Sequence, residues 1–375
     1  MPNNSGAYCL KLILSVDALS SPLSGIGRYT WELASRIGQV QSVEQVRYFR
    51  NGEWIDDPAS LLNGASSGRK RHYKLPRWAK DWYWRQACRG EVFHGPNFFL
   101  PPYAENGAVT VHDLSVFKFP ETHPVERLRE FDRLFQRTLD RAAHLITVSE
   151  TTKQEIIAYL DWPAEKITAI HNGVSAFFAP RNSEALMPLL SRYGLQYCGY
   201  ILCVSTIEPR KRIDALLDAY NQLPVSLRAT YPLVLVGGKG WLSESLHKQI
   251  ERGQHAGWLH YLGYVPEADL PALYAGAQLF AYPSIYEGFG LPVIEAMASG
   301  VPVLTSNRSC LPEVAAGAAR LVNPDDIDAL TAGLEEGLVD SAWREKAITC
   351  GLKVAVRYDW AECVKQTAAV YVDKI

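Results

Sequence analysis

The sequence predicts two successive α/β domains, each a doubly wound parallel sheet, that face a central cleft. Three observations lead to this fold class. The 375 residues are too many for one ordinary core. Short apolar runs alternate with helix-length amphipathic stretches, as in parallel sheets that helices cover on both faces. The alternation weakens once, after "AIHNGV", where Pro180 intervenes, and this marks a domain break.

The apolar runs predict strands on both sides of the break. In the first half they lie at 11–16, 92–94, 108–111, 144–148 and 167–170. In the second half they lie at 200–204, 233–236, 259–262, 279–281, 301–304 and 319–322. We therefore expect one domain at 1–175 and another at 176–356, with a C-terminal helix at about 357–375 that packs back on the first.

Composition and charge exclude several classes of protein. With 47% hydrophobic and 21% charged residues and a formal net charge of -2, bulk electrostatics does not favour polyanion binding. The seven cysteines are scattered and never spaced Cys-x-x-Cys, which argues against disulfides or zinc and suits a reducing cytoplasm. The N-terminus is expected to form a buried strand rather than a signal peptide, and no window approaches a membrane span.

The stretch "EGFGLPVIE" follows an apolar run and precedes a helical pattern, so it should lie at the carboxyl end of a strand. Its glycines let backbone approach a ligand, and the helix start offers N–H groups to a diphosphate. Glu287 and Glu295 could bind hydroxyl groups on either side of that turn. The alternative is that Glu287 is merely exposed and that Glu295 favours the helix N-terminus electrostatically.

The longer stretch "SIYEGFGLPVIEAMASGVPVLTS" resembles the C-terminal signature of glycosyltransferase family 4, whose members are retaining enzymes with the GT-B fold of two Rossmann-like domains. Further stretches match the family in order across nearly the whole chain: "GIGRYTWEL", "VTVHDLS", "ITVSETTKQEI", "IHNGV", "ILCVSTIEPRKRIDALLDAY", "LVLVGGKGW", "YLGYVPEADLPALYAGA" and "LPEVAAGAARLVNPDD". The resemblance implies an acceptor domain at 1–175 and a nucleotide-sugar donor domain at 176–356.

The resemblance also implies roles for the residues of the "EGFGLPVIE" stretch. Glu287 should contact hydroxyls of the donor sugar and act in catalysis, and Glu295 should contact the ribose. The backbone of the four residues after Glu287 should lie along the diphosphate and the sugar: Gly288, Phe289, Gly290 and Leu291.

The "EPRKR" stretch should supply cations that neutralise the departing diphosphate. Lys211 stands where the family has its lysine. The family's partner arginine is missing from its place, where Ser205 and Thr206 stand instead. Arg210 either substitutes for it or pairs with Glu208.

Loops after other strands of the second domain complete the implied donor site. Gly237 and Gly238 in "VGGKGW" suit a turn that passes close to the ligand, and Tyr264 and Val265 in "LGYVPEADL" should border the nucleobase.

In the first domain, the loop with Gly25 and Gly27 should reach the donor phosphates, although it lacks the last glycine of a dinucleotide fingerprint. His112 at a strand end matches the family's contact with the donor sugar, and it is expected to be catalytic. Asp113 and His94 are weaker candidates on the acceptor side.

We expect no metal and no other cofactor. The Asp-x-Asp spelling at Asp326 and Asp328 opens a helix after "VNP", so capping explains it better than a metal site.

Residues 69–89, "RKRHYKLPRWAKDWYWRQACR", combine eight Lys/Arg with interleaved aromatic residues. Such a stretch suits an anionic membrane surface. The candidate membrane or acceptor-side residues are Arg69, Lys70, Arg71, Lys74, Trp78 and Trp82. Nucleic-acid binding gives a similar composition but has no supporting motif here. The other alternative is a half-buried surface helix with its tryptophans in the core.

The sequence therefore predicts a retaining hexosyltransferase at the inner face of the cytoplasmic membrane. By resemblance to bacterial enzymes of O-antigen synthesis, it should move mannose or D-rhamnose, GDP-linked, to a saccharide on a polyprenyl diphosphate. The alternatives are a UDP-hexose donor, a nucleotide-sugar epimerase of the same fold, and a non-catalytic glycan- or membrane-binding protein.

Overall fold

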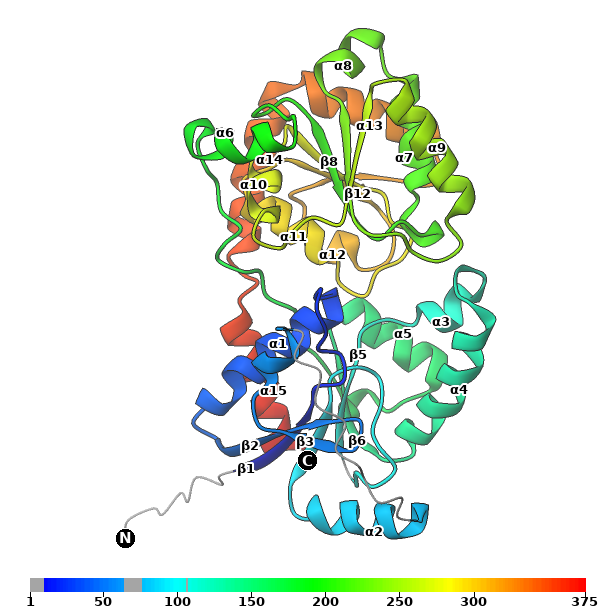
Figure 1. The fold of residues 1–375 in the computed structure, drawn as a ribbon, viewed down its shortest axis with the longest axis vertical. Helices are drawn as coiled ribbons and strands as arrows, with labels where there is room; N and C mark the ends of the chain where they lie inside the picture. The colour runs from blue at the N-terminus through cyan, green and yellow to red at the C-terminus, as the bar shows by residue number, and fades with distance from the viewer. Residues whose placement is uncertain (1–9, 64–75, 106) are drawn as a thin grey trace. The chain divides into compact units, whose positions relative to one another are not determined.

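The computed structural model describes residues 10–63, 76–105 and 107–375 (Figure 1). The chain forms two compact units. Unit 1 comprises residues 1–114, 126–173 and 360–375, and unit 2 comprises residues 115–125 and 174–359. The final segment therefore belongs to unit 1, although 186 residues of unit 2 (174 to 359) precede it in the chain.

Unit 1 contains a seven-stranded sheet in the order β3-β2-β1-β4-β5-β6-β7. Its pairs are parallel except β2 with β3, which is antiparallel. The strands are β1 (Leu10–Ser15), β2 (Val43–Arg50), β3 (Glu53–Ile55), β4 (Val92–Gly95), β5 (Gly107–Val111), β6 (Ala142–Thr147) and β7 (Ile167–Ala169). The helices are α1 (Gly25–Arg36), α2 (Arg77–Ala87), α4 (Val125–Leu139), α5 (Glu150–Leu160) and α15 (Trp360–Lys374).

Unit 2 contains a six-stranded, wholly parallel sheet in the order β10-β9-β8-β11-β12-β13. The strands are β8 (Ile201–Val204), β9 (Leu233–Val236), β10 (Leu259–Gly263), β11 (Leu279–Tyr282), β12 (Val303–Ser306) and β13 (Arg320–Val322). The helices are α3 (Ser115–Lys118), α6 (Ser183–Arg192), α7 (Ile213–Gln222), α8 (Val225–Thr230), α9 (Glu244–His255), α10 (Leu270–Ala275), α11 (Leu291–Ala298), α12 (Leu311–Ala315), α13 (Ile327–Val339) and α14 (Ser341–Ala355).

The strands predicted from apolar runs are present with shifts of one or two residues, but β2 and β3 were missed. The β2 sequence "VEQVRYFR" has buried residues only at Val43 and Phe49, because it lies toward the edge of the sheet. A strand of this kind has no continuous apolar run, so its sequence signal is weak.

Capping side chains set several helix starts that border the sheet ends. Ser24 accepts a hydrogen bond from the Gly27 amide at 3.0 Å at the start of α1. Asp326 accepts one from the Ala329 amide at 2.9 Å at the start of α13. The predicted capping role of Asp326 is therefore confirmed, and Asp328 lies in the first turn of that helix.

Residues 115–125 pack within unit 2, whereas the sequence division placed them in the first domain. The Phe119 ring lies 5.0 Å from the Tyr286 ring, centroid to centroid. The Trp241 indole N–H donates to the Thr122 carbonyl oxygen. The segment thus packs on the loops that follow β9 and β11.

A buried polar network links the strands of unit 1 to its first and last helices. His94 is fully buried; its Nε2 hydrogen-bonds the Thr110 hydroxyl at 2.9 Å and its Nδ1 the Tyr371 hydroxyl of α15 at 2.6 Å. The Tyr29 hydroxyl of α1 meets the same Thr110 hydroxyl at 2.9 Å. Both ring nitrogens of His94 are therefore occupied inside the core, which is the geometry of a structural residue rather than an acceptor contact.

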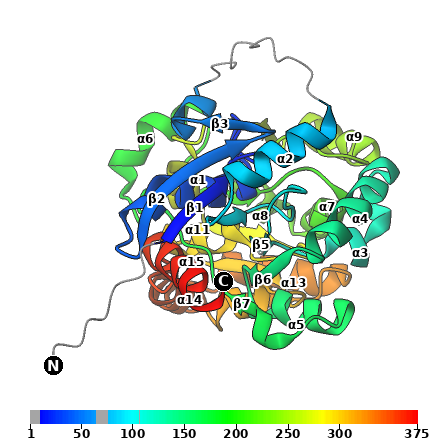
Figure 2. The same ribbon diagram turned by 90° about the horizontal axis from the view of Figure 1, so that it is seen from below.

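Helix α2 runs alongside β2 and β3 (Figure 2). Its tryptophan side chains differ in burial. Trp84 is buried against Phe49 and Trp54, with ring centroids 5.0 and 5.2 Å away. Trp78 and Trp82 are instead 75% and 64% exposed. Of the predicted alternatives, burial in the core therefore holds for Trp84 but not for this pair. Within the described residues, every helix is too short or too polar to cross a bilayer.

We expect His94→Gln to reduce the acid sensitivity of unit 1. Burial, with a smaller effect of nearby His112, lowers the pKa of His94 from 6.5 to about 3. Below about pH 6.5, His94 is therefore protonated in the unfolded chain but stays neutral in the folded chain down to about pH 3. The free energy of unfolding that depends on this histidine is complete above about pH 6.5 and falls by about 1.4 kcal/mol per pH unit toward pH 3.

The measurement is the melting temperature of the wild type and of His94→Gln at about pH 7 and about pH 5. The melting temperature of the wild type should fall more on acidification than that of His94→Gln. Equal losses in the two proteins would contradict the assignment, and His94→Asn serves as a second variant in case glutamine packs poorly.

Candidate active site

The candidate site begins where the strand order of unit 2 reverses, between β8 and β11. In open α/β sheets, ligands bind at such a point, beyond the carboxyl ends of the strands. The loops after these two strands are in contact there. The Arg210 carbonyl oxygen accepts hydrogen bonds from the Ile285 amide at 3.0 Å and from the Ser284 hydroxyl at 3.2 Å.

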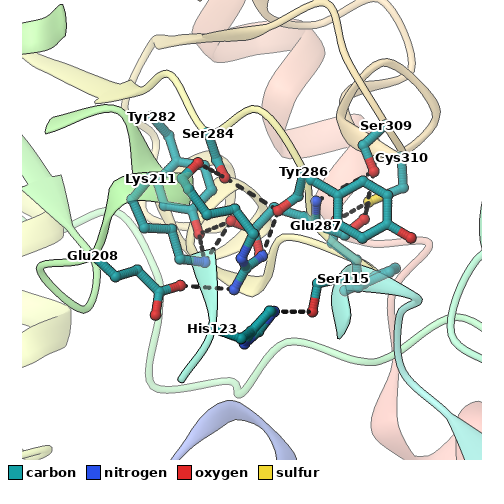
Figure 3. A network of polar contacts seen from close by, with 12 residues as sticks. Ser115, His123, Glu208, Lys211, Tyr282, Ser284, Tyr286, Glu287, Ser309 and Cys310 are labelled. Carbon is teal, nitrogen blue, oxygen red and sulfur yellow. Dashed lines mark hydrogen bonds and ion pairs between the residues drawn. The ribbon is translucent and has the colours of Figure 1, made fainter. Parts of the chain in front are cut away.

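Glu287 lies at the centre of a buried polar cluster between these loops (Figure 3). The Lys211 ammonium donates to its Oε1 at 2.5 Å, and the Tyr282 hydroxyl donates to the same oxygen at 2.8 Å. Lys211 Nζ also donates to the Tyr282 hydroxyl at 3.2 Å. The structure therefore brings together Glu287 and Lys211, which the sequence predicted as site residues from positions 76 residues apart.

The charge state of Glu287 follows from these neighbours. Burial alone would raise the pKa of its carboxyl group, but the Lys211 and Arg210 cations outweigh this effect and lower it to about 2. Glu287 is therefore an anion at neutral pH. An ionised carboxylate can only accept hydrogen bonds, which is the property needed to bind sugar hydroxyls.

Arg210 belongs to the same cluster, so both predicted alternatives for it have a counterpart in the structure. Its Nη2 donates to Glu208 Oε1 at 2.8 Å, and its Nη1 lies 3.4 Å from Glu287 Oε2 and donates to the Tyr286 carbonyl oxygen. Glu208 is only 2% exposed. Glu208 thus holds Arg210 beside Glu287 rather than directing it away from the site.

Three residues that hold this cluster were not predicted from the sequence: Tyr282, Ser309 and Cys310. Glu208 was predicted only as the alternative partner of Arg210. Tyr282 is the last residue of β11, and the position alone indicates a side chain at the site edge of the sheet. Ser309 and Cys310 lie in the loop after β12, and the sequence offers no motif that singles out their side chains.

The turn after Glu287 has the predicted architecture. Gly290 has a φ of +96° and is the N-cap of α11, so a left-handed residue precedes the helix. Gly288 and Phe289 are buried, and Leu291 begins the helix half-buried. Because α11 begins at Leu291, Glu295 is its fifth residue and lies in the second turn rather than the first.

Glu295 is half-buried, and its carboxylate lies near the Tyr274 hydroxyl. Burial raises the pKa of Tyr274 well above its ordinary value, and the Glu295 charge raises it further. The electrostatic effect of a helix start falls off within the first turn, so the capping explanation for Glu295 loses its basis.

The predicted residues in the loops after β9 and β10 differ in how closely their surroundings pack against them. Gly237 has a φ of +143°, and a Cβ there would lie 1.9 Å from the Ser205 carbonyl oxygen, so loop packing alone requires glycine. Gly238 has open space on its Cβ side. Val265 is buried, whereas Tyr264 is 60% exposed and available to a ligand.

In unit 1, His112 follows β5 and is held in one tautomer. Its Nε2–H donates to the Pro96 carbonyl oxygen at 2.8 Å. Burial lowers the pKa of His112 below its ordinary value, although the Pro96 carbonyl and the Asp113 carboxylate act in the opposite direction. A neutral ring that donates through Nε2 keeps Nδ1 as a hydrogen-bond acceptor.

The remaining predicted residues lie at loop ends or outside the described chain. Gly25 is exposed at the first position of α1, and Gly27 is buried at the third position, within the first turn. Asp113 is half-buried directly after His112. Arg69, Lys70, Arg71 and Lys74 lie outside the described residues.

Two family models match the chain. The one described as "Glycosyltransferase Family 4" matches residues 23–176, and the one described as "Glycosyl transferases group 1" matches residues 199–353. The O-antigen chain mannosyltransferase B of Escherichia coli is 39% identical over 96% of this chain and 99% of that protein. The serotype-specific mannosyltransferase WbdA of Escherichia coli is 34% identical over 62% of this chain but only 29% of that protein.

Solved structures share the fold. The glycosyltransferase WaaG, involved in lipopolysaccharide biosynthesis, superposes with a TM-score of 0.74 at 18% identity over 96% of this chain and 100% of that one. The Anabaena protein Alr3699/HepE, solved with UDP and glucose, gives 0.73 at 17% identity over 98% and 100%. The predicted GT-B fold is thereby confirmed. With both family models matched and a relative aligned over nearly its full length, the chain belongs to glycosyltransferase family 4.

Proposed function

We propose that the chain is a retaining mannosyltransferase that uses GDP-mannose and extends an O-antigen saccharide on a polyprenyl diphosphate. The observation that carries the proposal is the Lys211–Glu287 pair at the switch point of unit 2, in a chain that is 39% identical to an O-antigen chain mannosyltransferase. GDP is favoured by the resemblance of the sequence to bacterial enzymes of O-antigen synthesis that use GDP-linked sugars.

The cations of the cluster suit a departing nucleoside diphosphate. Breaking the bond between the anomeric carbon and the phosphate oxygen leaves negative charge on the diphosphate. Fixed cations in a water-poor site stabilise such charge without reorganisation. Lys211 and Arg210 are both largely buried, with 10% and 11% of their side chains exposed, and Glu287 and Glu208 hold them in place.

Two acceptors are available for the sugar hydroxyls. Glu287 is ionised, and its Oε2 has Arg210 at 3.4 Å rather than the close Lys211 contact that Oε1 makes. His112 in unit 1 has Nδ1 as an acceptor because Nε2 donates to Pro96. We assign Glu287 to the donor sugar on this geometry, and we assign His112 to it on the family resemblance of the sequence alone; two acceptors fit the hydroxyl-rich nature of mannose.

We explain retention of the anomeric configuration by front-face transfer. The bond to the diphosphate oxygen breaks, and the acceptor oxygen bonds to the anomeric carbon on the same face. The acceptor proton passes to the leaving phosphate oxygen. The chain's role is to hold the diphosphate and the sugar hydroxyls. We assign Glu287 to the sugar hydroxyls rather than to attack on the anomeric carbon, because Lys211 and Tyr282 donate to its Oε1 and Arg210 lies 3.4 Å from its Oε2.

Helix α2 supports docking at the inner face of the cytoplasmic membrane, where a lipid-linked acceptor would be found. Trp78, Trp82 and Arg85 share one helical face by their spacing of four and three residues, and all three are exposed. Indole rings favour the membrane interface, and cations favour anionic head groups. The basic residues of 69–74 precede this helix directly in the chain.

The donor prediction concerns ligand-induced stabilisation. GDP and GDP-mannose should raise the melting temperature, and UDP and UDP-glucose should not. At about a hundredfold excess over Kd a ligand stabilises the folded state by about 2.7 kcal/mol, or about 5–10 °C for a domain of this size. GDP-D-rhamnose, added to the same panel and to a transfer assay, decides between the two GDP-linked sugars.

Lys211→Ala should lose most of the GDP shift, because it removes a buried cation. Lys346→Ala is the matched control, since Lys346 is exposed on α14. A larger shift with UDP than with GDP would refute the donor base. Inversion of one carbon centre of a GDP-sugar in the absence of any acceptor would favour the epimerase. Binding of a nucleotide sugar without any turnover would favour the non-catalytic alternative.

The membrane prediction concerns vesicle binding. The wild type should co-sediment with vesicles that contain anionic phospholipid and bind less to purely zwitterionic ones. Replacing Trp78 and Trp82 by glutamine should weaken binding to both, because the interfacial contribution is lost. Replacing Arg69, Lys70, Arg71 and Lys74 by glutamine should weaken only the anionic component.

Phe177→Gln is the control for removing an exposed aromatic, because Phe177 is 75% exposed in unit 2. Undiminished binding of both α2-region variants would disprove membrane docking through this segment. Competition by single-stranded DNA for the same residues would instead favour the nucleic-acid alternative.

A further inference from the structure

Glu287 is fixed not only at its carboxylate but also at its backbone, by the loop that connects β12 to α12. The Glu287 amide donates to the Ser309 hydroxyl at 3.2 Å, and that hydroxyl donates to the Glu287 carbonyl oxygen at 2.6 Å. One side chain therefore satisfies both backbone polar groups of Glu287. Figure 3 shows Ser309 and Cys310 together on the side of Glu287 away from Lys211.

Cys310 holds the same turn at a second point. Its Sγ lies 3.1 Å from the Glu287 carbonyl oxygen and 3.1 Å from the Phe289 carbonyl oxygen. The side chain is fully buried, and burial, with the Glu287 charge adding to it, raises the pKa of the thiol well above its ordinary value. The group therefore stays protonated and acts as a neutral donor shared by two carbonyls.

The backbone conformation of Ser309 indicates that its side chain has a specific role. Its φ is +55°, in the left-handed region that disfavours residues with a Cβ. Glycine would adopt this conformation more readily, but it would leave the Glu287 amide and carbonyl without the hydroxyl. Serine at a position that favours glycine is explained by these two hydrogen bonds.

We propose that Ser309 and Cys310 are positioning residues that set the orientation of the Glu287 carboxylate toward the donor sugar. The proposal rests on the function proposed above. They act through the backbone of Glu287 and Phe289. Lys211, Arg210 and Tyr282 hold the side-chain end, so Glu287 is held from two loops at once. A small displacement of such a group costs rate more than binding, because the contact must match the transition state.

The test compares Ser309→Gly and Cys310→Ala with the wild type in transfer from GDP-mannose. Ser309→Gly removes the hydroxyl without backbone strain, so a loss of activity cannot be attributed to φ. We expect kcat to fall about 10- to 100-fold in each variant. The midpoint for GDP in the thermal-shift assay should stay within about twofold, because the diphosphate cations are untouched.

Two further measurements separate positioning from general destabilisation. Cys310→Ser keeps a small donor and should recover most of the activity lost in Cys310→Ala. Hydrogen exchange of the 284–290 segment should quicken in Ser309→Gly, because the Glu287 amide loses its acceptor. Cys363→Ala is the control for truncating a buried cysteine, since Cys363 is 2% exposed on α15 of unit 1.

Glu287→Gln is the reference that separates the two proposals. If it is inactive while Ser309→Gly and Cys310→Ala have the wild-type kcat, the positioning role is wrong and the proposed function stands. If Glu287→Gln is fully active, the assignment of Glu287 to the sugar fails, and the positioning role fails with it. Parallel losses of kcat and of GDP affinity in Ser309→Gly and Cys310→Ala would also overturn the inference, because they indicate collapse of the whole loop.

Discussion

A carboxylate buried as deeply as that of Glu287 cannot remain ionised unless cations lie beside it. Lys211 at 2.5 Å and Arg210 at 3.4 Å meet this requirement, and Glu208 in turn holds Arg210 at 2.8 Å. The same cations are what a departing diphosphate needs, so one electrostatic arrangement serves both the sugar end and the phosphate end of a donor. The surrounding loops can be understood as the means of keeping these charges together.

The parallel topology explains why the charges can meet at all. Glu208, Arg210 and Lys211 follow β8, and Glu287 follows β11, which are adjacent strands although far apart in the chain. The carboxyl ends of parallel strands lie at one edge of the sheet, and the reversal of strand order leaves space between their loops. Ser309 and Cys310 follow the next strand, β12, so three consecutive strand ends build the surroundings of one carboxylate.

The fold class, most strands and the central pair could be predicted from the sequence, because apolar runs and ordered motifs depend on local pattern. Other features depend on side-chain direction. Trp78, Trp82 and Trp84 are alike in sequence, yet only Trp84 is buried, because it alone faces β2 and β3. His94 at a strand end looked like a site residue, but Thr110 and Tyr371 occupy both its nitrogens. Tyr371 lies 277 residues away, which no spacing argument covers.

The most direct test of the account is a double-mutant cycle on the thermal stability of unit 2, with Lys211→Met, Glu287→Gln and both together. Removing one member of a buried ion pair leaves an uncompensated polar group and costs about 3–5 kcal/mol, whereas removing both costs less. The double variant should melt at a higher temperature than Lys211→Met alone, because no buried anion then lacks its cation. Additive losses, with the double variant the least stable of the three, would contradict it.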